Sequence, residues 1–296
     1  MVSFDTKLFN DSIYNIYYKL TNNDKEYKII ENKDLLKANK YYKEDLSNYV
    51  HNTDKLVASN KQDLINIYYS TLNNGYEKLT FYCDDSYVNC LNDISELNFE
   101  DSNFSYTNQL VNVYNSYSSI ESSYTNNSRI EIKINKKYSE EDINRIDKKI
   151  NDVINSLNIN NYQNTRDKIK IFHDYLAAYN SYDEDMAKNG KSEYHSDSAV
   201  GALLEGKAIC SGYTDALSLF LDKIGIENVR VASNNHVWNA LKLNNTWYHI
   251  DMTWDDPIVI GGANIIQYDY FMITTKELEN KNNDEHIFNK DIYNFL

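Results

Sequence analysis

Three residues whose side chains can carry out nucleophilic catalysis follow one another in the last third of the chain: Cys210, His236 and Asp251. A cysteine thiolate is a strong nucleophile, and an imidazole can take up the thiol proton and return it to a leaving group. A carboxylate can fix the tautomer and the orientation of that imidazole. The three residues therefore predict covalent chemistry at a carbonyl carbon, provided that the fold brings them together.

The residues after Cys210 predict a helix that begins at the cysteine. Apolar side chains recur at helical spacing over Ala216–Ile224, and Gly225 stands where a glycine commonly ends a helix. Free backbone N–H groups and the helix dipole at the first turn favour the thiolate over the thiol, and the N–H of the cysteine itself could donate to an oxyanion. We further expect Gly206 and Gly212 to let the backbone approach a substrate.

Three short strands are expected after this helix, at Val229–Ser233, His236–Leu243 and Thr246–Asp251. Asn244 and Asn245 lie between the last two strands and tolerate the positive φ of a two-residue hairpin turn. The strands of a hairpin lie about 5 Å apart, so the imidazole and the carboxylate become cross-strand or diagonal neighbours. A helix packed on this sheet could then present Cys210 to His236.

The stretch from Lys168 to Phe271, about a third of the chain, resembles the transglutaminase-like superfamily, in particular its bacterial protease-like or transglutaminase-like members. The matching motifs are GKAICSGYTDAL around the cysteine, NHVWNALKL around the histidine and TWYHIDMTWDDP around the aspartate, with KIKIFHDYL and SAVGALL upstream. Val200 departs from the pattern, because an aromatic residue is expected there. The resemblance implies an α+β, papain-like core in which a helix bearing the cysteine packs on an antiparallel sheet bearing the histidine and the aspartate.

An oxyanion hole needs a second donor besides the cysteine N–H. In transglutaminases an aromatic side chain upstream of the cysteine fills this role. Tyr182 and Tyr194 are the candidates here, the sequence does not choose between them, and it is equally open that neither does so. Trp238 and Trp254 flank the histidine and the aspartate and are candidates for the wall of the substrate cleft, with packing in the core as the alternative.

The other histidines give weaker signals. We interpret His173 as structural and prefer a packing role for His195 and His249, although His249 shares a strand face with the aspartate. His51 and His286 lie in polar surroundings and give no signal. The sequence has no paired CxxC motifs, no HExxH motif and no EF-hand loop, so we expect neither a metal nor a cofactor.

Cys83 and Cys90 are the other two of the three cysteines and lie close together, in FYCDDSYVNCL. Two small buried side chains are the simpler interpretation, and a local disulfide is the other. If the protein is exported, we expect the two residues to be close enough to bridge, which requires Cα atoms within about 7 Å. Such a bond would in turn support export.

Composition and charge exclude several classes of function. The chain has 296 residues and a formal net charge of −14, so it is a poor candidate for binding nucleic acid or an anionic membrane. No apolar run reaches the roughly 18 residues of a transmembrane helix. The segment MVSFDTKLFND lacks the regions of a signal peptide. Because bacterial members of the resembled superfamily are often exported, we expect an extracellular or cell-surface location with the signal removed, and the cytoplasm is the alternative.

Three regions are predicted along the chain: a helical N-terminal arm at 1–60, an α/β accessory region at 61–160 and a catalytic core at 161–296. Tyr14, Tyr17 and Tyr18 share a helical face in the arm. The accessory region is predicted to end in an amphipathic helix capped by Ser139. A polar break at 158–164 is the predicted boundary to the core.

We therefore predict acyl transfer on peptide or amide substrates through a thioacyl-enzyme. With water as the acceptor the protein is a peptidase or amidase, and with a lysine amine it is a protein-crosslinking transglutaminase. The sequence does not decide between the two. The expected partner is a protein or peptide, and a cell-wall peptide is one candidate. A catalytically silent binding or adhesion module at the cell surface is the alternative, although a binder needs no such set of three residues.

Overall fold

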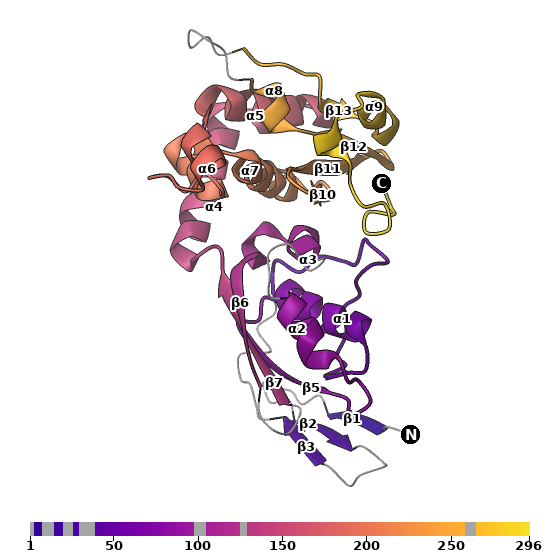
Figure 1. Ribbon diagram of the computed structural model, residues 1–296. Coiled ribbons are helices and arrows are strands. Elements are labelled where there is room, and N and C mark those ends of the chain that lie inside the picture. The colour runs from indigo at the N-terminus through magenta and orange to yellow at the C-terminus, as the bar shows by residue number, and fades with distance from the viewer. Residues whose placement is uncertain are drawn as a thin grey trace. The chain divides into compact units, whose positions relative to one another are not determined.

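The computed structural model describes residues 3–7, 15–19, 26–29, 39–97, 105–124, 129–257 and 265–296 (Figure 1). Contacts within the chain divide it into two units. One comprises residues 1–45 and 50–137, and the other comprises 46–49 and 138–296. Helices and sheets are mixed in both units, so the fold is α+β. No helix of the described residues combines the length and the apolar character needed to cross a membrane.

The first unit contains two sheets, with strand orders β1-β2-β3 and β4-β5-β7-β6. Its elements are β1 (Ser3–Lys7), β2 (Asn15–Lys19), β3 (Glu26–Ile29), β4 (Val57–Ala58), α1 (Lys61–Asn73), β5 (Lys78–Cys83), α2 (Cys90–Leu97), α3 (Ser105–Leu110), η1 (Val113–Asn115), β6 (Tyr117–Tyr124) and β7 (Arg129–Lys136).

The N-terminal arm differs from the helical arm that we expected over residues 1–60. Its described residues contain the antiparallel strands β1, β2 and β3 and, over 39–60, no helix; two of the three tyrosines of the proposed helical face, Tyr17 and Tyr18, lie in β2. Tyr14 lies outside the described residues. Tyrosine and isoleucine are enriched in strands, so a weak helical pattern built from them is a poor predictor of a helix.

The first unit also contains the disulfide that the sequence left as one of two alternatives. Cys83 at the end of β5 and Cys90 at the start of α2 are joined, with their Cα atoms 6.1 Å apart. The same strand packs on α1, where Tyr68 meets Phe81 edge to face. The Tyr68 hydroxyl and that of Ser122 in β6 are 3.1 Å apart. The bond therefore fixes α2 to the end of a buried strand.

The second unit is built around a four-stranded antiparallel sheet in the order β10-β11-β12-β13. Its elements are α4 (Glu140–Ser156), η2 (Ile159–Asn161), α5 (Thr165–Tyr179), β8 (Ser181–Tyr182), α6 (Glu184–Asn189), η3 (Gly201–Glu205), β9 (Lys207–Ala208), α7 (Cys210–Lys223), β10 (Asn228–Ala232), β11 (Val237–Leu243), β12 (Thr246–Ile250), α8 (Met252–Asp255), β13 (Phe271–Ile273), α9 (Thr275–Asn280) and η4 (Asp284–His286).

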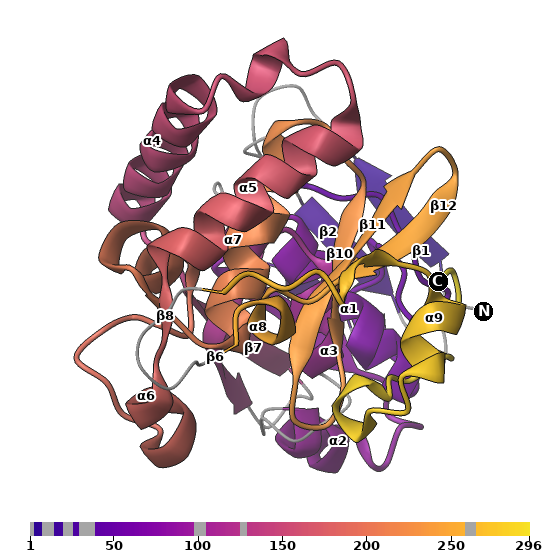
Figure 2. The same cartoon turned by 90° about the horizontal axis from the view of Figure 1, so that it is seen from above.

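Helix α7 lies in the centre of this unit. It packs on β10 and β11 and also contacts α5 (Figure 2). Phe172 of α5 stacks face to face on Phe220 of α7, with ring centroids 3.9 Å apart. Gly225 follows the helix with φ +74°, the left-handed conformation that ends helices at glycine. Cys210 is therefore the first residue of a rigid, buried helix.

The predicted hairpin is present. Asn244 and Asn245 have φ of 51° and 63°, and Leu243 pairs with Thr246 across them. Two left-handed residues between paired strands match the twist of the sheet. The turn fixes the register of β11 against β12, which decides the residues that face each other at the far end of the hairpin.

The predicted boundary at 158–164 lies inside the second unit. Helix α4, which precedes it, begins with the predicted cap at Ser139 and packs on η3 of the same unit. The division between the units falls after Lys137 instead. A polar stretch indicates an exposed connection, and here that connection joins two helices, α4 and α5, of one unit.

A buried ion pair ties α7 to the sheet. Arg230 of β10 donates to Asp215 Oδ1 at 2.8 Å, and the Tyr138 hydroxyl donates to Asp215 Oδ2 at 2.6 Å. Tyr138 in turn accepts from the backbone N–H of Ala199. A buried charge of this kind is tolerated only while its partners are in place.

Asp215→Asn should lower the free energy of unfolding of this unit by about 3–5 kcal/mol, because it leaves Arg230 buried without its carboxylate. All three tryptophans lie in this unit, so their fluorescence during urea unfolding reports on it. The matched control is Asp152→Asn, which breaks the exposed pair with Lys148 and should change the free energy by no more than about 0.5 kcal/mol. Equal effects of the two substitutions would contradict the role given to the buried pair.

Candidate active site

Cys210 has a free, half-buried side chain at the first position of α7. The segment before the helix is held by the N–H of Ile209, which donates to the carbonyl of Ser196 at 2.9 Å. A Cβ on Gly212 would lie 2.3 Å from that same carbonyl oxygen. The space beside Gly212 is therefore taken by the chain itself and not, as expected from the sequence, left for a substrate. Likewise a Cβ on Gly206 would meet the carbonyl of Tyr179 at 3.2 Å.

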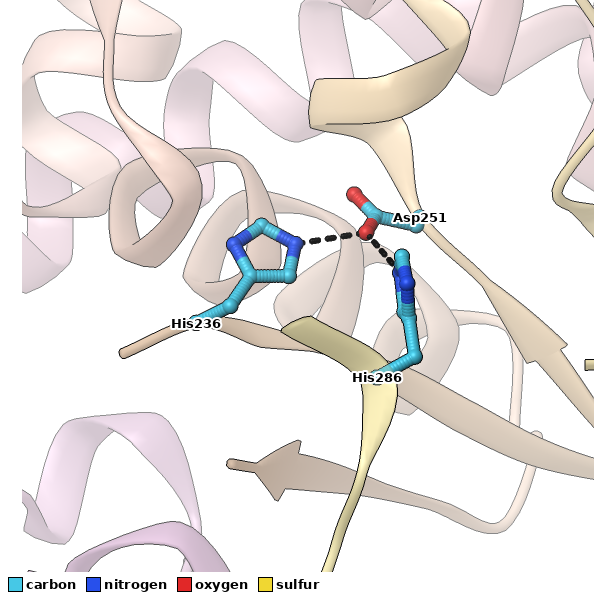
Figure 3. A group of neighbouring side chains, drawn as sticks. All are labelled: His236, Asp251 and His286. Carbon is cyan, nitrogen blue, oxygen red and sulfur yellow. Dashed lines mark hydrogen bonds and ion pairs between the residues drawn. The ribbon is translucent and has the colours of Figure 1, made fainter. Parts of the chain in front are cut away.

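His236 and Asp251 are brought together by the hairpin. The register pairs Asn239 with Ile250, so the residue before β11 and the residue after β12 meet beyond the paired strands. His236 Nε2 and Asp251 Oδ2 are 2.6 Å apart (Figure 3), and both side chains are buried. Both residues lie just outside the strands in which they were expected, yet their proximity is as the hairpin predicted.

The Asp251 carboxylate has two roles, one for each of its oxygen atoms. Its Oδ1 accepts from the backbone N–H groups of Thr253 at 2.9 Å and Trp254 at 3.3 Å, which caps α8. Its Oδ2 accepts from His236. Because the cap fixes the carboxylate plane, the second oxygen is aimed at the imidazole.

Charge interactions favour an ionised imidazolium–carboxylate pair. Burial lowers the pKa of His236, but the charge of Asp251, its hydrogen bond and the neighbouring Cys210 outweigh burial and raise the pKa to about 10. Burial raises the pKa of Asp251, but His236 and His286 outweigh it and lower the pKa to about 2. With Nε2 held by Asp251, Nδ1 points away from the carboxylate and is the ring atom left for the thiol (Figure 3).

A second histidine, which was not expected from the sequence, joins this group. His286 of η4 is buried, and its Nε2 lies 2.7 Å from the same Asp251 Oδ2. Figure 3 shows the two imidazole rings on either side of the carboxylate. His286 stands in a polar turn, NNDEHIF, with no periodic neighbours. Only its placement after the sheet could have suggested a return toward the site.

The structure places the two tyrosine candidates for the oxyanion hole in different surroundings. Strand β8 pairs in parallel with β9, so Tyr182 lies beside Ala208, two residues before the cysteine. The pKa of Tyr182 is raised by burial first and then by the charge of Cys210. Tyr194 is 37% exposed, and the groups that raise its pKa are Glu193, Asp183 and Glu205. The fold therefore brings Tyr182, and not Tyr194, to the nucleophile.

The two tryptophans differ in their exposure to solvent. Trp238 is only 1% exposed, and its indole N–H donates to His249 Nδ1 at 3.0 Å. It belongs to the core and cannot wall an open cleft, because its ring is enclosed by His249, His286 and Phe288. Trp254 is 39% exposed, and its indole N–H donates to Glu285 at 3.2 Å. Trp254 thus remains a candidate for the edge of a substrate site.

The other histidines have structural partners. His249 is buried, burial lowers its pKa to about 3, and its second ring nitrogen lies 3.1 Å from the Thr275 hydroxyl. His173 lies 3.2 Å from Asp255 at the end of α8. His195 pairs with Glu205 near the surface. The packing interpretation fits His173 and His249, which are buried, whereas the side chain of His195 is exposed.

Among the described residues, His236, Asp251 and His286 form one group whose ligand atoms all lie within 4.8 Å of one another, as a metal site would require. The Nε2–Oδ2 separations are 2.6 and 2.7 Å. Two ligands of one tetrahedral zinc ion, bound at 2.0–2.1 Å, would be about 3.3 Å apart. The observed distances therefore fit hydrogen bonds from the two imidazoles to the carboxylate better than they fit ligands of a metal ion.

No protein-family model and no curated protein matches the chain. One similar solved structure is described as "Crystal structure of a TGase". It has a TM-score of 0.36 and 15% identity over 74% of this chain. The chain spans 63% of the length of that structure's chain. At this TM-score the two folds differ too much for the likeness to assign a family.

Iodoacetamide should label Cys210 and leave Cys83 and Cys90 unmodified until the disulfide is reduced, as peptide mass mapping would show. At pH 6 the wild-type protein should react about tenfold or more faster than His236→Ala, because the imidazolium supports the thiolate. Because the pKa of His236 is raised to about 10, the imidazolium and the rate advantage that it gives persist at neutral pH and are lost as the pH rises through about 10. Equal rates of the two proteins at pH 6 would contradict the pairing of Cys210 with His236.

Proposed function

We propose that the protein is a transglutaminase-like enzyme that transfers acyl groups through a thioacyl intermediate on Cys210. The observation that carries the proposal is the buried His236–Asp251 pair, 2.6 Å apart, beside a free cysteine at a helix N-terminus. The three motifs of the sequence support the same assignment, because they supply these three residues in the order that the superfamily uses.

In the first half-reaction the Cys210 thiolate attacks the carbonyl carbon of a peptide bond or a side-chain amide. A carbon–sulfur bond forms, and the carbonyl electron pair moves to the oxygen. When the oxyanion collapses, the carbon–nitrogen bond breaks and the imidazolium of His236 gives its proton to the departing amine. The products are a thioester on the enzyme and a free amine.

In the second half-reaction an acceptor attacks the thioester while neutral His236 takes up the acceptor's proton. The carbon–sulfur bond breaks, and the thiolate and the imidazolium are restored. Asp251 accepts a hydrogen bond from the Nε2–H group of His236 throughout, so Nδ1 always faces the thiol and the reacting groups. Water as the acceptor gives hydrolysis, and a primary amine gives transamidation.

The proposed oxyanion hole combines the backbone N–H of Cys210 with the hydroxyl of Tyr182. Both belong to segments fixed by the β8–β9 pairing, and the pKa of Tyr182, raised by burial and the charge of Cys210, keeps its hydroxyl protonated as a donor. The proposed substrates are proteins or peptides, with cell-wall peptides included. The Cys83–Cys90 disulfide supports an oxidising compartment, in which such substrates would be met.

The reaction can be identified by incubating the protein with peptide mixtures with and without a primary amine and following mass changes. Peptide cleavage or loss of ammonia without the amine identifies a hydrolase, and a mass gain equal to the amine minus ammonia identifies a transamidase. Binding of a peptide with no mass change would instead support a silent binding or adhesion module.

Cys210→Ala should abolish the reaction with the fold intact, because the side chain lies half-buried at a helix start. Asp251→Asn should lower kcat by about 10⁴ if the analogy to serine triads holds. The double variant of Cys210 and His236 should be hardly slower than either single variant, because the two act as a unit. Turnover of the peptide identified above measures all three, and a chloroacetamide probe, with the label located by mass spectrometry, shows whether Cys210 is the residue that reacts. Labelling in His236→Ala at the wild-type rate would contradict the mechanism.

Tyr182→Phe should lower kcat by about 10²–10³ with little change in KM, because it removes one donor to the oxyanion. Tyr194→Phe is the matched control and should leave kcat within about twofold, because exposed substitutions away from a site have small effects. Steady-state kinetics on the peptide identified above measures both. A larger loss from Tyr194→Phe than from Tyr182→Phe would reverse the assignment.

A further inference from the structure

We infer that His286 is a fourth member of the site, a positioning residue that holds the Asp251 carboxylate by a hydrogen bond on the side away from His236. This inference rests on the proposed function. It adds to the triad a residue that touches neither the thiol nor a substrate and acts only through Asp251.

The first argument is the number of donors on the carboxylate. Asp251 Oδ2 meets the Nε2 atoms of His236 and His286 at 2.6 and 2.7 Å, while Oδ1 accepts two backbone N–H groups. A buried carboxylate is stable only when donors replace its lost water. Without His286, one of the four donors is missing, and among the described residues His236 alone is left to donate to Oδ2.

The second argument is the tautomer of His286. An ionised carboxylate only accepts, so Nε2 of His286 must carry the proton. Its Nδ1 is buried and has no hydrogen-bond partner. A bare ring nitrogen in that position costs less than a charged N–H group without an acceptor. The ring is therefore a neutral donor, which steadies the carboxylate without adding a second cation that would compete with His236.

The third argument is that the turn carrying His286 is fixed on several sides. The imidazole stacks on Tyr270, with ring centroids 4.7 Å apart, and meets Trp238 edge to face at 5.0 Å. Asn283 donates to the Tyr270 hydroxyl at 3.3 Å, and Glu285 accepts from the indole of Trp254. A ring held in this way returns to one position after each turnover, as a positioning residue must.

The fourth argument concerns the charge of Asp251. The hydrogen bond from His286 is one of the interactions that lower the pKa of this carboxylate. The other titratable groups that interact with Asp251 or His286 come from several elements: His236, His249, Asp255, Tyr182 and Tyr270. None of these but His236 donates to Oδ2 among the described contacts, so loss of the His286 donor raises the pKa of Asp251.

The test compares His286→Gln, whose amide N–H₂ can take the place of Nε2, with His286→Phe, which keeps an aromatic ring but has no donor. The rate of Cys210 alkylation by iodoacetamide is measured from pH 2 to pH 10 in both variants and in the wild type. As the pH is lowered, the Phe variant should lose its Cys210 alkylation rate about one pH unit earlier than the wild type. The reason is that the variant lacks one hydrogen bond to the charged Asp251 carboxylate. The Gln variant should keep the wild-type profile.

Turnover provides a second readout. The Phe variant should lose kcat by about tenfold or more with KM unchanged, and the Gln variant should retain most of it. Thermal unfolding checks that each variant is folded. If the Phe variant does not fold, His286→Asn replaces it. The asparagine amide is one methylene too short to reach Asp251, so this variant also lacks the donor and should show the same losses.

The inference would be overturned if the donor-free variant kept the wild-type kcat and lost Cys210 reactivity at the same acidic pH as the wild type. It would also be overturned if the Gln variant lost as much kcat as the donor-free variant. These outcomes leave an activated Cys210 and so leave the proposed function intact. A wild-type Cys210 that reacts no faster than an ordinary thiol overturns the proposed function and this inference with it.

Discussion

One buried carboxylate sets the requirements that the rest of the second unit meets. Ionised Asp251 is removed from water, which costs several kcal/mol unless donors replace the lost hydration. The chain supplies those donors from three separate places: the start of β11, the first turn of α8 and the turn η4. Each of these segments must be docked for the charge to be tolerated, so the same contacts that stabilise the carboxylate also align His236.

Cys210, the proposed nucleophile, is held by different means. Cys210 begins a helix that is buried along most of its length, between the sheet and α5, and joined to the sheet by the Asp215–Arg230 pair. The loop before it is anchored by Asp183, which accepts from the hydroxyl groups of Ser192 and Ser196. Thiol and imidazole are thus carried by rigid elements, and only the loops around them are left to shape a substrate site.

The sequence predicted those parts of the fold whose residues follow a strong local pattern. Apolar periodicity located α7, and the two asparagines located the hairpin that brings His236 to Asp251. Strand β6, YSSIESSY, was missed because it is an edge strand with few apolar side chains. His286 and the burial of Trp238 were missed for another reason: both depend on contacts between segments far apart in the chain. No local pattern records such contacts.

The position of η4 also has a consequence for how the site forms and fails. Its donor reaches a carboxylate 35 residues earlier in the chain, so its contact is a non-local one and carries a loop-closure cost. Short surface turns open far more often than a whole domain unfolds. The fraction of molecules that hold all four donors at a given instant is therefore set by the opening of this one turn, and heating should disable the site before it unfolds the sheet.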